Sequence, residues 1–565
     1  MSNPLAQRAQ VFSALEHGVD VLVIGGGITG AGVALDATTR GYAVGLVERS
    51  DFGSGTSSRS TKLVHGGLRY LPQWQFGLVR EAAIERDRLR RLAPHLVTPL
   101  PFLVPLYSGM RRPLGVKIPS PLLSLTGPII RTGLWLYDLL ASADLRHTRV
   151  APEVLLAEIP GIRTDGLSAA YRYHDAQTDD VRLTYAVLWA ARKAGTLLLN
   201  YAEVIAIDPG PPAAVTVRDR LGGGEVHIRA RHVVNAAGIW AEAVARLGGD
   251  VPFRIQHSKG VHLILELPLQ AISALVIPET DDGRLAFLVP WRDRWILGTT
   301  DESHDAALHS PTTTAAEARY LLDHLNRYLH VPVGPDAIVG AYAGLRSLVR
   351  RGDARPADLS RSHEVIEHRN AMVSIIGGKL TTYRKMAEDT VDALVRRDGR
   401  QIACRTSTLP LDPEADADRI TAAARQAGLD AEQALHLLAS YGSGTLRICQ
   451  ILGEDPLLRR RLVPDLPVIA AEAVYACREE QAVSLADWML IRSRLAALDR
   501  RRGEGCADDV AAIMGGELGW TKTEIAMQLQ AFRRAVAAEM AFADELRSSP
   551  VYWSSGSIDP PSTIR

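Results

Sequence analysis

The feature that most constrains this chain is the segment DVLVIGGGITGAGVALDATTRGYAVGLVERS at residues 20–50. It contains Gly25, Gly27 and Gly30, spaced as G-x-G-x-x-G. The first glycine of such a pattern permits a tight turn, and the second lets a pyrophosphate approach the backbone. The third lets the following helix pack closely on the preceding strand. The spacing therefore predicts a loop that holds a dinucleotide.

The residues around the glycines complete the expected unit. Residues 21–24 are an apolar run typical of a buried strand, residues 28–40 are expected to form a helix, and residues 43–47 predict a second strand. Such a helix directs its N-terminus toward the phosphates. Glu48 ends the second strand, where a carboxylate accepts the hydroxyls of the adenosine ribose and disfavours a 2′-phosphate. The whole unit indicates a Rossmann-like βαβ fold, without deciding between NAD and FAD.

The next segment, SDFGSGTSSRSTKLVHGGLRYL at residues 50–71, has the composition of a ligand-covering loop. It is rich in glycine and hydroxyl groups and shows little apolar periodicity. Its hydroxyl groups, on Thr56, Ser57 and Ser58 among others, can bond to phosphate or to the edges of a flavin. A plain surface loop is the alternative, but His65 and Arg69 between glycines and apolar residues are unusual for one.

Several longer motifs recur in a fixed order along the chain. They are TSSRSTKLVHGGLRYL, YHDAQTDDVRL, VVNAAGIWA, FLVPWRDRWILGTTDE, YAGLRSL and IIGGKLTTYRKMAEDTVDAL, followed by the helical segment YACREEQAVSLADWMLIRSRLA. Together they resemble the FAD-dependent glycerol-3-phosphate dehydrogenases, the respiratory, quinone-linked family. The resemblance covers roughly residues 18 to 540.

The resemblance implies an α/β fold, with a Rossmann-like FAD-binding domain, an antiparallel-sheet substrate cap and a C-terminal α-helical domain. These domains are expected to be discontinuous in the sequence. We expect FAD-binding segments at 18–105, 165–250 and 340–400, an inserted segment at 106–164, a cap at 251–339, a helical domain at 405–545 and a flexible tail at 546–565.

Charge and hydropathy limit the partners of the chain. Lysine plus arginine equals aspartate plus glutamate, 64 each, so no global field attracts nucleic acid. No run reaches the ~18 apolar residues that a spanning helix needs. The apolar residues 110–141 are broken by prolines and carry basic side chains, which suits a segment lying in a membrane interface. A packed hairpin of the core is the alternative. The family contains peripheral membrane enzymes, which favours a position on the cytoplasmic face of the inner membrane over a cytoplasmic one.

Oxidation of a phosphorylated secondary alcohol needs an anion clamp, and arginine matches phosphate with a planar fork. Arg69, Arg346 and Arg361 correspond to arginines that the family uses around its substrate. A surface ion pair is the alternative for any one of these arginines. Tyr70 is expected to pack over the substrate or bond to it.

A base must also accept the hydroxyl proton, and a histidine suits that task. His65 and His262 both match family histidines, and the sequence does not decide between them. Lys379, in GGKLTTYRK, is expected to stabilise negative charge on the flavin or to touch the substrate oxygen. A solvated lysine at a helix cap is the alternative. The catalytic residues implied are therefore His65, His262, Lys379 and Arg346, and the substrate-binding ones are Arg69, Tyr70, Arg346, Arg361 and Lys379.

Only seven of the 64 basic residues are lysine, so a lysine in a glycine-rich motif suggests that a compact ammonium is needed there. This observation adds Lys62 to the cofactor-binding residues. The full prediction is Gly25, Gly27, Ile28, Thr29, Gly30, Glu48, Thr56, Ser57, Ser58, Lys62, Val204, Ala237, Gly238, Trp240, Gly378, Leu380 and Thr381. No metal site is expected. FAD is expected to bind without a covalent link, because no histidine or cysteine lies in an evident attachment motif. Ala237 and Ser347 depart from the family pattern, where threonine and proline are common.

The predicted function is oxidation of sn-glycerol 3-phosphate to dihydroxyacetone phosphate by hydride transfer to FAD, with a membrane quinone as final acceptor. A glycerol-3-phosphate oxidase that uses dioxygen is the nearest alternative, since only the acceptor differs. Amine or amino-acid oxidases, and a flavin-binding module without catalysis, are more distant alternatives. A homodimer is a further assembly that the prediction allows.

Overall fold

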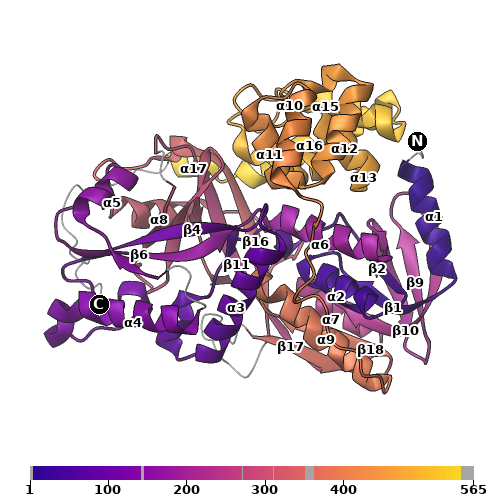
Figure 1. Cartoon of the computed structure of the whole chain (residues 1–565), viewed down its shortest axis with the longest axis horizontal. Helices are drawn as coiled ribbons and strands as arrows, with labels where there is room; N and C mark the ends of the chain where they lie inside the picture. Colours follow the sequence, from indigo (N-terminus) through magenta and orange to yellow (C-terminus); the bar gives the residue numbers. More distant parts are fainter. Residues whose placement is uncertain (1–3, 142–145, 270–271, 310, 350–361, 549–565) are drawn as a thin grey trace.

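The computed structural model describes residues 4–141, 146–269, 272–309, 311–349 and 362–548. It consists of two large sheets with their helices and a group of C-terminal helices that packs against them (Figure 1). In the view of Figure 1 one sheet lies to the right, around β1 and β10, the other lies to the left, around β4 and β6, and the C-terminal helices lie above them.

The first sheet has eight strands and carries the glycine-rich segment. Its order is β17 (His363–Glu367), β18 (Met372–Gly377), β10 (Glu225–Asn235), β1 (Val19–Ile24), β2 (Val44–Val47) and β7 (Leu197–Leu199). From β18 to β7 all neighbours are parallel. The hairpin of β8 (Ala202–Asp208) and β9 (Ala213–Asp219) extends from β10.

Helices cover both faces of this sheet, as its strands require, because the central strands are apolar on each side. On one face α2 (Ile28–Thr39) packs between α6 (Asp180–Ala194) and α9 (Tyr383–Arg397). The other face is covered by α1 (Pro4–Glu16), α7 (Ala241–Leu247) and the β8–β9 hairpin. The predicted strand, helix and second strand of residues 21–47 are thus confirmed.

The second sheet has ten strands and is largely antiparallel. Its order is β15 (Glu302–Ser303), β11 (Ile255–Leu265), β14 (Arg294–Gly298), β13 (Ala286–Trp291), β12 (Ala274–Ile277), β4 (Thr98–Tyr107), β6 (Leu167–Gln177) and β3 (Leu63–Val64). In addition, β16 (Ile338–Val349) pairs with β11, and β5 (Thr148–Arg149) pairs with β6. Within this sheet β13 and β14 pair antiparallel as a hairpin.

The helices around the second sheet are α3 (Phe76–Leu92), α4 (Thr126–Leu140), α5 (Pro152–Glu158) and α8 (Ala315–Asn326). Residues 4–397 also contain short 3₁₀ turns: η1 (Thr56–Ser58), η2 (Leu68–Gln73), η3 (Pro113–Gly115), η4 (Ser120–Leu125), η5 (Gly238–Trp240), η6 (Pro335–Ala337) and η8 (Leu380–Thr382). α8 begins with a capping box in which Thr314 and Glu317 satisfy each other's backbone N–H groups.

The C-terminal part is helical, as expected. Its helices are α10 (Ala417–Gln426), α11 (Ala431–Tyr441), α12 (Gly444–Glu454), α13 (Ala471–Glu479), α14 (Leu495–Leu498), α15 (Ala507–Leu518), α16 (Lys522–Met540) and α17 (Ala543–Ser548), with turns at η9 (Pro456–Arg459) and η10 (Asp487–Arg492). Capping boxes begin α11 at Asp430 and α16 at Thr521.

The segments 18–105, 165–250 and 340–400, which are expected to bind FAD, contribute strands to both sheets. From them, β4, β6 and β16 lie wholly or largely in the ten-stranded sheet. Apolar alternation predicts a strand but does not say which sheet it joins. Residues 197–208 form two strands, β7 and β8, which pair with different partners.

Candidate active site

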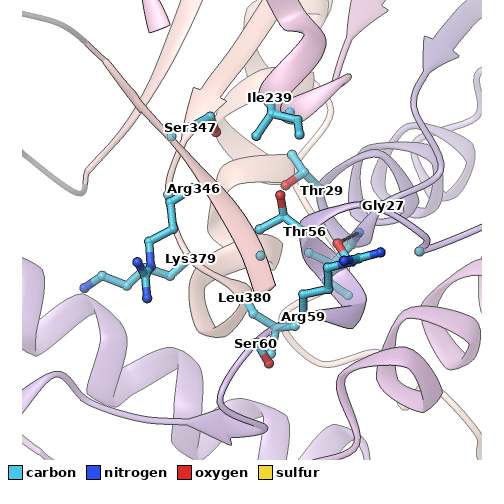
Figure 2. Close-up of a pocket in the computed structure, with 18 of the residues that line it drawn as sticks. Gly27, Thr29, Thr56, Arg59, Ser60, Ile239, Arg346, Ser347, Lys379 and Leu380 are labelled. Atoms are coloured by element: carbon cyan, nitrogen blue, oxygen red, sulfur yellow. Dashed lines mark hydrogen bonds between the residues drawn. The ribbon is translucent and has the colours of Figure 1, made fainter. Parts of the chain in front are cut away.

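A cavity of about 610 Å³ is lined by residues of both sheets. The eight-stranded sheet contributes the ends of β1, β2 and β10 and the turn after β18. The ten-stranded sheet contributes side chains from β4, β6, β11, β13 and β16. Figure 2 shows ten labelled lining residues, among them Gly27, Thr56, Arg346 and Lys379. Segments far apart in the sequence therefore meet around one space.

The backbone geometry of the glycine turn explains why glycine occupies these positions. Gly25 has a φ of +115°, and a Cβ there would lie 2.6 Å from the carbonyl oxygen of Ala236. A Cβ on Gly30 would lie 1.9 Å from the carbonyl oxygen of Gly25, so only glycine lets α2 pack on the turn. Gly25, Gly27, Ile28 and Thr29 line the cavity, whereas Gly30 supports them from behind.

Glu48 lies at the end of β2 and lines the cavity. Its carboxylate accepts hydrogen bonds from the backbone N–H groups of Gly26, at 2.7 Å, and Ser50, at 2.8 Å. Burial raises the pKa of Glu48, and these two hydrogen bonds oppose the shift. The carboxylate is thus fixed beside the glycine turn, where a ribose of a bound dinucleotide would be met.

The hydroxyl-rich loop approaches the same turn. The Ser57 hydroxyl accepts a hydrogen bond from the N–H of Ile28, the first residue of α2, at 2.9 Å. Thr56 donates to the Leu345 carbonyl at 2.6 Å. Both residues line the cavity, but Ser58 does not, because its buried hydroxyl bonds to the Gly55 carbonyl at 3.1 Å. Ser58 therefore stabilises the loop.

Lys62 is a clear correction to the sequence-based prediction. Its side chain is buried and does not line the cavity. The ammonium donates to Asp180 at 2.6 Å and to the Ser58 carbonyl at 2.9 Å, and burial lowers the pKa of Lys62 to about 8. The Lys62 ammonium therefore forms an internal ion pair behind the cavity wall.

At the other end of the cavity two arginines meet one carboxylate. Arg346, on β16, has Nη1 3.2 Å from an oxygen of Asp301 and donates from Nη2 to the Thr299 hydroxyl at 3.0 Å. Arg69, in η2, has Nη2 3.8 Å from the other oxygen of Asp301. Both arginines line the cavity. Arg361 lies outside the described residues.

Lys379 and Tyr70 form a second group beside the arginines. The Lys379 ammonium lies 3.8 Å from the centre of the Tyr70 ring, a cation–π distance. The guanidinium of Arg69 lies 5.3 Å from the same ring. Lys379 precedes η8 and α9, and its neighbours Gly377 and Gly378 both have positive φ. Figure 2 shows the side chains of Lys379 and Arg346 extending to the same side of the pocket.

Both candidate histidines line the cavity. The backbone N–H of His65 donates to the Thr381 hydroxyl at 3.1 Å, which ties the HGG loop to the turn after Lys379. His262, on β11, shares a hydrogen bond of 2.8 Å with the Thr61 hydroxyl through Nε2 and stacks on Tyr342. Burial lowers the pKa of His262 well below its usual range, with added repulsion from Arg346 and Lys62.

The remaining predicted cofactor residues also line the cavity. They are Val204, Ala237, Gly238, Trp240, Gly378, Leu380 and Thr381. The Arg49 guanidinium lies 4.7 Å from the centre of the Trp240 ring.

The sequence did not predict a role in the site for Arg49, Arg59, Asp175 or Asp301. Asp301 had a signal in the sequence, since it ends the hydroxyl-rich GTTD turn, but its partners are too distant in the chain to be identified.

Segment 110–141 packs beside the cavity. Leu114, in η3, lines it, and α4 buries Ile130, Leu134 and Tyr137 at helical spacing. The other side of α4 exposes Trp135 and Leu139, which are 59% and 66% accessible. A search of the described residues finds no helix long and apolar enough to cross a membrane.

Two protein-family models match the chain. One, described as FAD-dependent oxidoreductase, matches residues 20–384, and the other, described as the C-terminal domain of alpha-glycerophosphate oxidase, matches residues 404–525. The first model covers the glycine turn and every cavity residue described above. The second covers helices from α10 to the start of α16.

Curated relatives align over nearly the whole chain. Glycerol-3-phosphate dehydrogenase 2 of Mycobacterium tuberculosis is 37% identical over 555 residues, which cover 95% of this chain and 91% of the relative. The mitochondrial glycerol-3-phosphate dehydrogenase of Homo sapiens is 35% identical over 571 residues, covering 95% of this chain and 76% of the relative.

Solved structures agree with the fold. The glycerol-3-phosphate dehydrogenase from Bacillus halodurans, complexed with FAD, superposes with a TM-score of 0.77 at 27% identity, covering 95% of this chain and 98% of that one. The L-alpha-glycerophosphate oxidase from Mycoplasma pneumoniae, with FAD bound, gives a TM-score of 0.54 at 15% identity, covering 68% and 96% of the two chains. The second likeness concerns the fold alone.

Proposed function

Since this chain belongs to the FAD-dependent glycerol-3-phosphate dehydrogenase family, we propose that it oxidises sn-glycerol 3-phosphate to dihydroxyacetone phosphate and passes the electrons to a membrane quinone. The observation that carries this proposal is the meeting of a dinucleotide turn and a cationic group in one cavity. Glu48 and the glycine turn line it together with Arg69, Arg346 and Lys379.

The residues of the cavity fit FAD. Small residues at Gly25, Gly27 and Ala237 leave the backbone accessible, and Glu48 is fixed beside them. We propose that these residues, with Thr56 and Ser57, hold the cofactor without a covalent link. When bound, FAD supplies the hydride acceptor for the substrate carbon and a store for two electrons.

The arginines supply what a phosphate monoester needs. We propose that Arg69 and Arg346 bind its oxygens, since guanidinium groups offer paired donors in a fixed fork. Clamping the phosphate fixes the glycerol C2 relative to the rest of the site, which lowers the entropic part of the barrier. Tyr70 would close one side of the substrate while its ring holds Lys379 in place.

A proton must leave the C2 hydroxyl as the hydride departs. His65 and His262 are the candidate bases, and both line the cavity. Burial depresses the pKa of His262, which favours the neutral ring, the form that can act as a base. The Lys379 ammonium would stabilise the developing oxyanion or the negative charge on the cofactor.

An anaerobic experiment tests the substrate. The FAD-loaded protein is mixed with sn-glycerol 3-phosphate, and the absorbance of the flavin is followed. We expect rapid bleaching, which is absent with glycerol and with the opposite enantiomer. Bound FAD that is not reduced would mean that the arginines bind another anion, and bleaching by amino acids would move the chain to the amine-oxidising flavoproteins.

The electron acceptor is tested separately. The apolar surface of segment 110–141 supports a quinone and a peripheral position on the inner membrane, because Leu114 of the same segment reaches the cavity. We expect turnover with short-chain quinones to exceed peroxide release in air at least ~tenfold. Peroxide formed at a rate equal to quinone turnover would instead identify an oxidase that uses dioxygen.

A further inference from the structure

We propose that Asp301 is a positioning residue that joins Arg69 and Arg346 into one anion-binding pair. The inference rests on the proposed function and deepens it, because it assigns the organisation of the phosphate clamp to a residue outside the cavity wall. Asp301 follows β14, at the end of the turn formed by residues 299–301. This turn lies within one of the motifs that resemble the family, but no role was expected for Asp301.

Asp301 divides its two carboxylate oxygens between the arginines. Oδ1 lies 3.2 Å from Nη1 of Arg346, and Oδ2 lies 3.8 Å from Nη2 of Arg69. The two arginines come from different elements, β16 and η2, that no shared backbone pairing holds together. The carboxylate therefore provides a direct link between them.

The turn around Asp301 fixes the guanidinium of Arg346 on several sides. Nη2 donates to the Thr299 hydroxyl at 3.0 Å, and the Thr300 carbonyl lies 3.4 Å from both terminal nitrogens. Gly260 on β11 leaves room for this group, because a Cβ there would lie 2.4 Å from Nη2. These contacts hold the guanidinium in one orientation at the cavity wall.

Asp301 is placed to act through the arginines and not on a ligand. It is 6% accessible and is not among the residues that line the cavity, whereas Thr299, Arg69 and Arg346 are. The Ser258 hydroxyl donates to Oδ1, which fixes the carboxylate in turn. A buried carboxylate needs such partners. The carboxylate in turn offsets the repulsion between the two guanidinium groups, which keeps them in position for an anion.

The test compares Asp301→Ala and Asp301→Asn with the wild type in FAD-loaded protein. Anaerobic flavin reduction at increasing sn-glycerol 3-phosphate gives a half-saturating concentration and a limiting rate. In Asp301→Ala we expect the half-saturating concentration to rise roughly tenfold or more, with a limiting rate within about threefold of the wild type. The half-saturating concentration of Asp301→Asn should lie between those of the wild type and Asp301→Ala, because the amide oxygen still accepts a hydrogen bond from Arg346.

Titration with inorganic phosphate, followed by the flavin spectrum or by calorimetry, measures the clamp without turnover. Its dissociation constant should rise in parallel with the half-saturating concentration. Glu302→Gln is the matched control, since Glu302 is the next residue, exposed on β15, and should leave both values unchanged.

The outcomes separate the two proposals. A wild type that binds phosphate but is not reduced by sn-glycerol 3-phosphate would overturn the proposed function, and the phosphate titration of the variants would still decide the role of Asp301. Unchanged phosphate binding in Asp301→Ala would overturn that role. A loss confined to the limiting rate would also overturn that role, because it would indicate a change near the flavin.

Discussion

Lys379 lines the cavity, whereas Lys62 and Lys259 do not. Lys62 is bound to Asp180, and Lys259 is bound to Glu317 at 2.9 Å, so neither can act on a ligand. We expect Lys379→Ala to slow flavin reduction at saturating substrate by well over ~tenfold, because a positive charge near a developing oxyanion lowers the barrier. Single-turnover reduction checks this, with FAD content as the control. A wild-type rate would contradict the assignment.

The protonation of His262 makes the stability of the protein depend on pH. Its pKa lies well below the 6.5 of an exposed ring in the folded protein, so below pH 6.5 only the unfolded state gains a proton there. Stability is therefore lost as the pH falls from about 6.5 toward the folded-state pKa.

We expect His262→Gln to lose less stability than the wild type between pH 7 and pH 5. The comparison of two pH values removes any constant cost of the substitution. Unfolding by denaturant, in the protein freed of FAD, measures the difference. The exposed His227 on β10 provides the control substitution. An equal loss in His262→Gln and the wild type would show that the ring is protonated in the fold.

At the scale of one element, α4 presents two different faces. The inner face carries Tyr137, whose hydroxyl donates to Asp175 at 2.7 Å, and Asp175 also accepts from the Gly66 N–H at 2.9 Å. The outer face carries Trp135 and Leu139, and exposed Trp74 follows η2, which contacts α4. Figure 1 shows α4 at the edge of the molecule, away from the C-terminal helices.

We expect the double substitution Trp135→Ser and Leu139→Ser to weaken liposome binding at least ~tenfold, because two large apolar side chains would no longer enter the acyl boundary. Flotation with anionic vesicles measures this. Leu435 and Met527 are 61% and 55% accessible on the C-terminal helices, and their replacement by serine is the matched control. Undiminished flotation of the α4 variant would leave the segment as part of the core only.

The site could be predicted from the sequence where its parts are close in the chain. The spacing of Gly25, Gly27 and Gly30 defines the turn locally, and the structure agrees. Lys62 was misassigned because its partner Asp180 lies far along the chain. Asp301 was missed for the same reason, since Arg69 and Arg346 come from two distant segments. Apolar alternation likewise predicts a strand such as β4 or β16 but does not identify the strand it pairs with.

At the scale of the whole molecule, buried ion pairs connect the C-terminal helices to the FAD-binding part. Arg492, in η10, donates from Nη2 to Asp51 at 2.7 Å, and both side chains are fully buried. Arg494 bonds in the same way to Asp180 at 2.6 Å, next to Lys62. Burial of such groups is favourable only while each charge keeps its partner.

We expect Arg492→Met to destabilise the protein by about 3–5 kcal/mol, because Asp51 is left buried without its main counter-charge. Adding Asp51→Asn should restore part of the loss, since the uncompensated charge is then removed. Thermal unfolding, followed by release of FAD fluorescence, measures both variants. If the double variant is no more stable than the single one, the cost arises from lost packing and not from charge.

The order of the eight-stranded sheet has a consequence in time. β1 and β2 are made first, yet β18, which borders β10 beside β1, begins at Met372, about 350 residues later. At roughly 5–20 residues per second, a ribosome needs on the order of twenty to seventy seconds for that stretch. During synthesis the glycine turn therefore exists well before the segment that carries Lys379. The nascent chain must keep an open sheet edge from pairing wrongly until its last neighbour emerges.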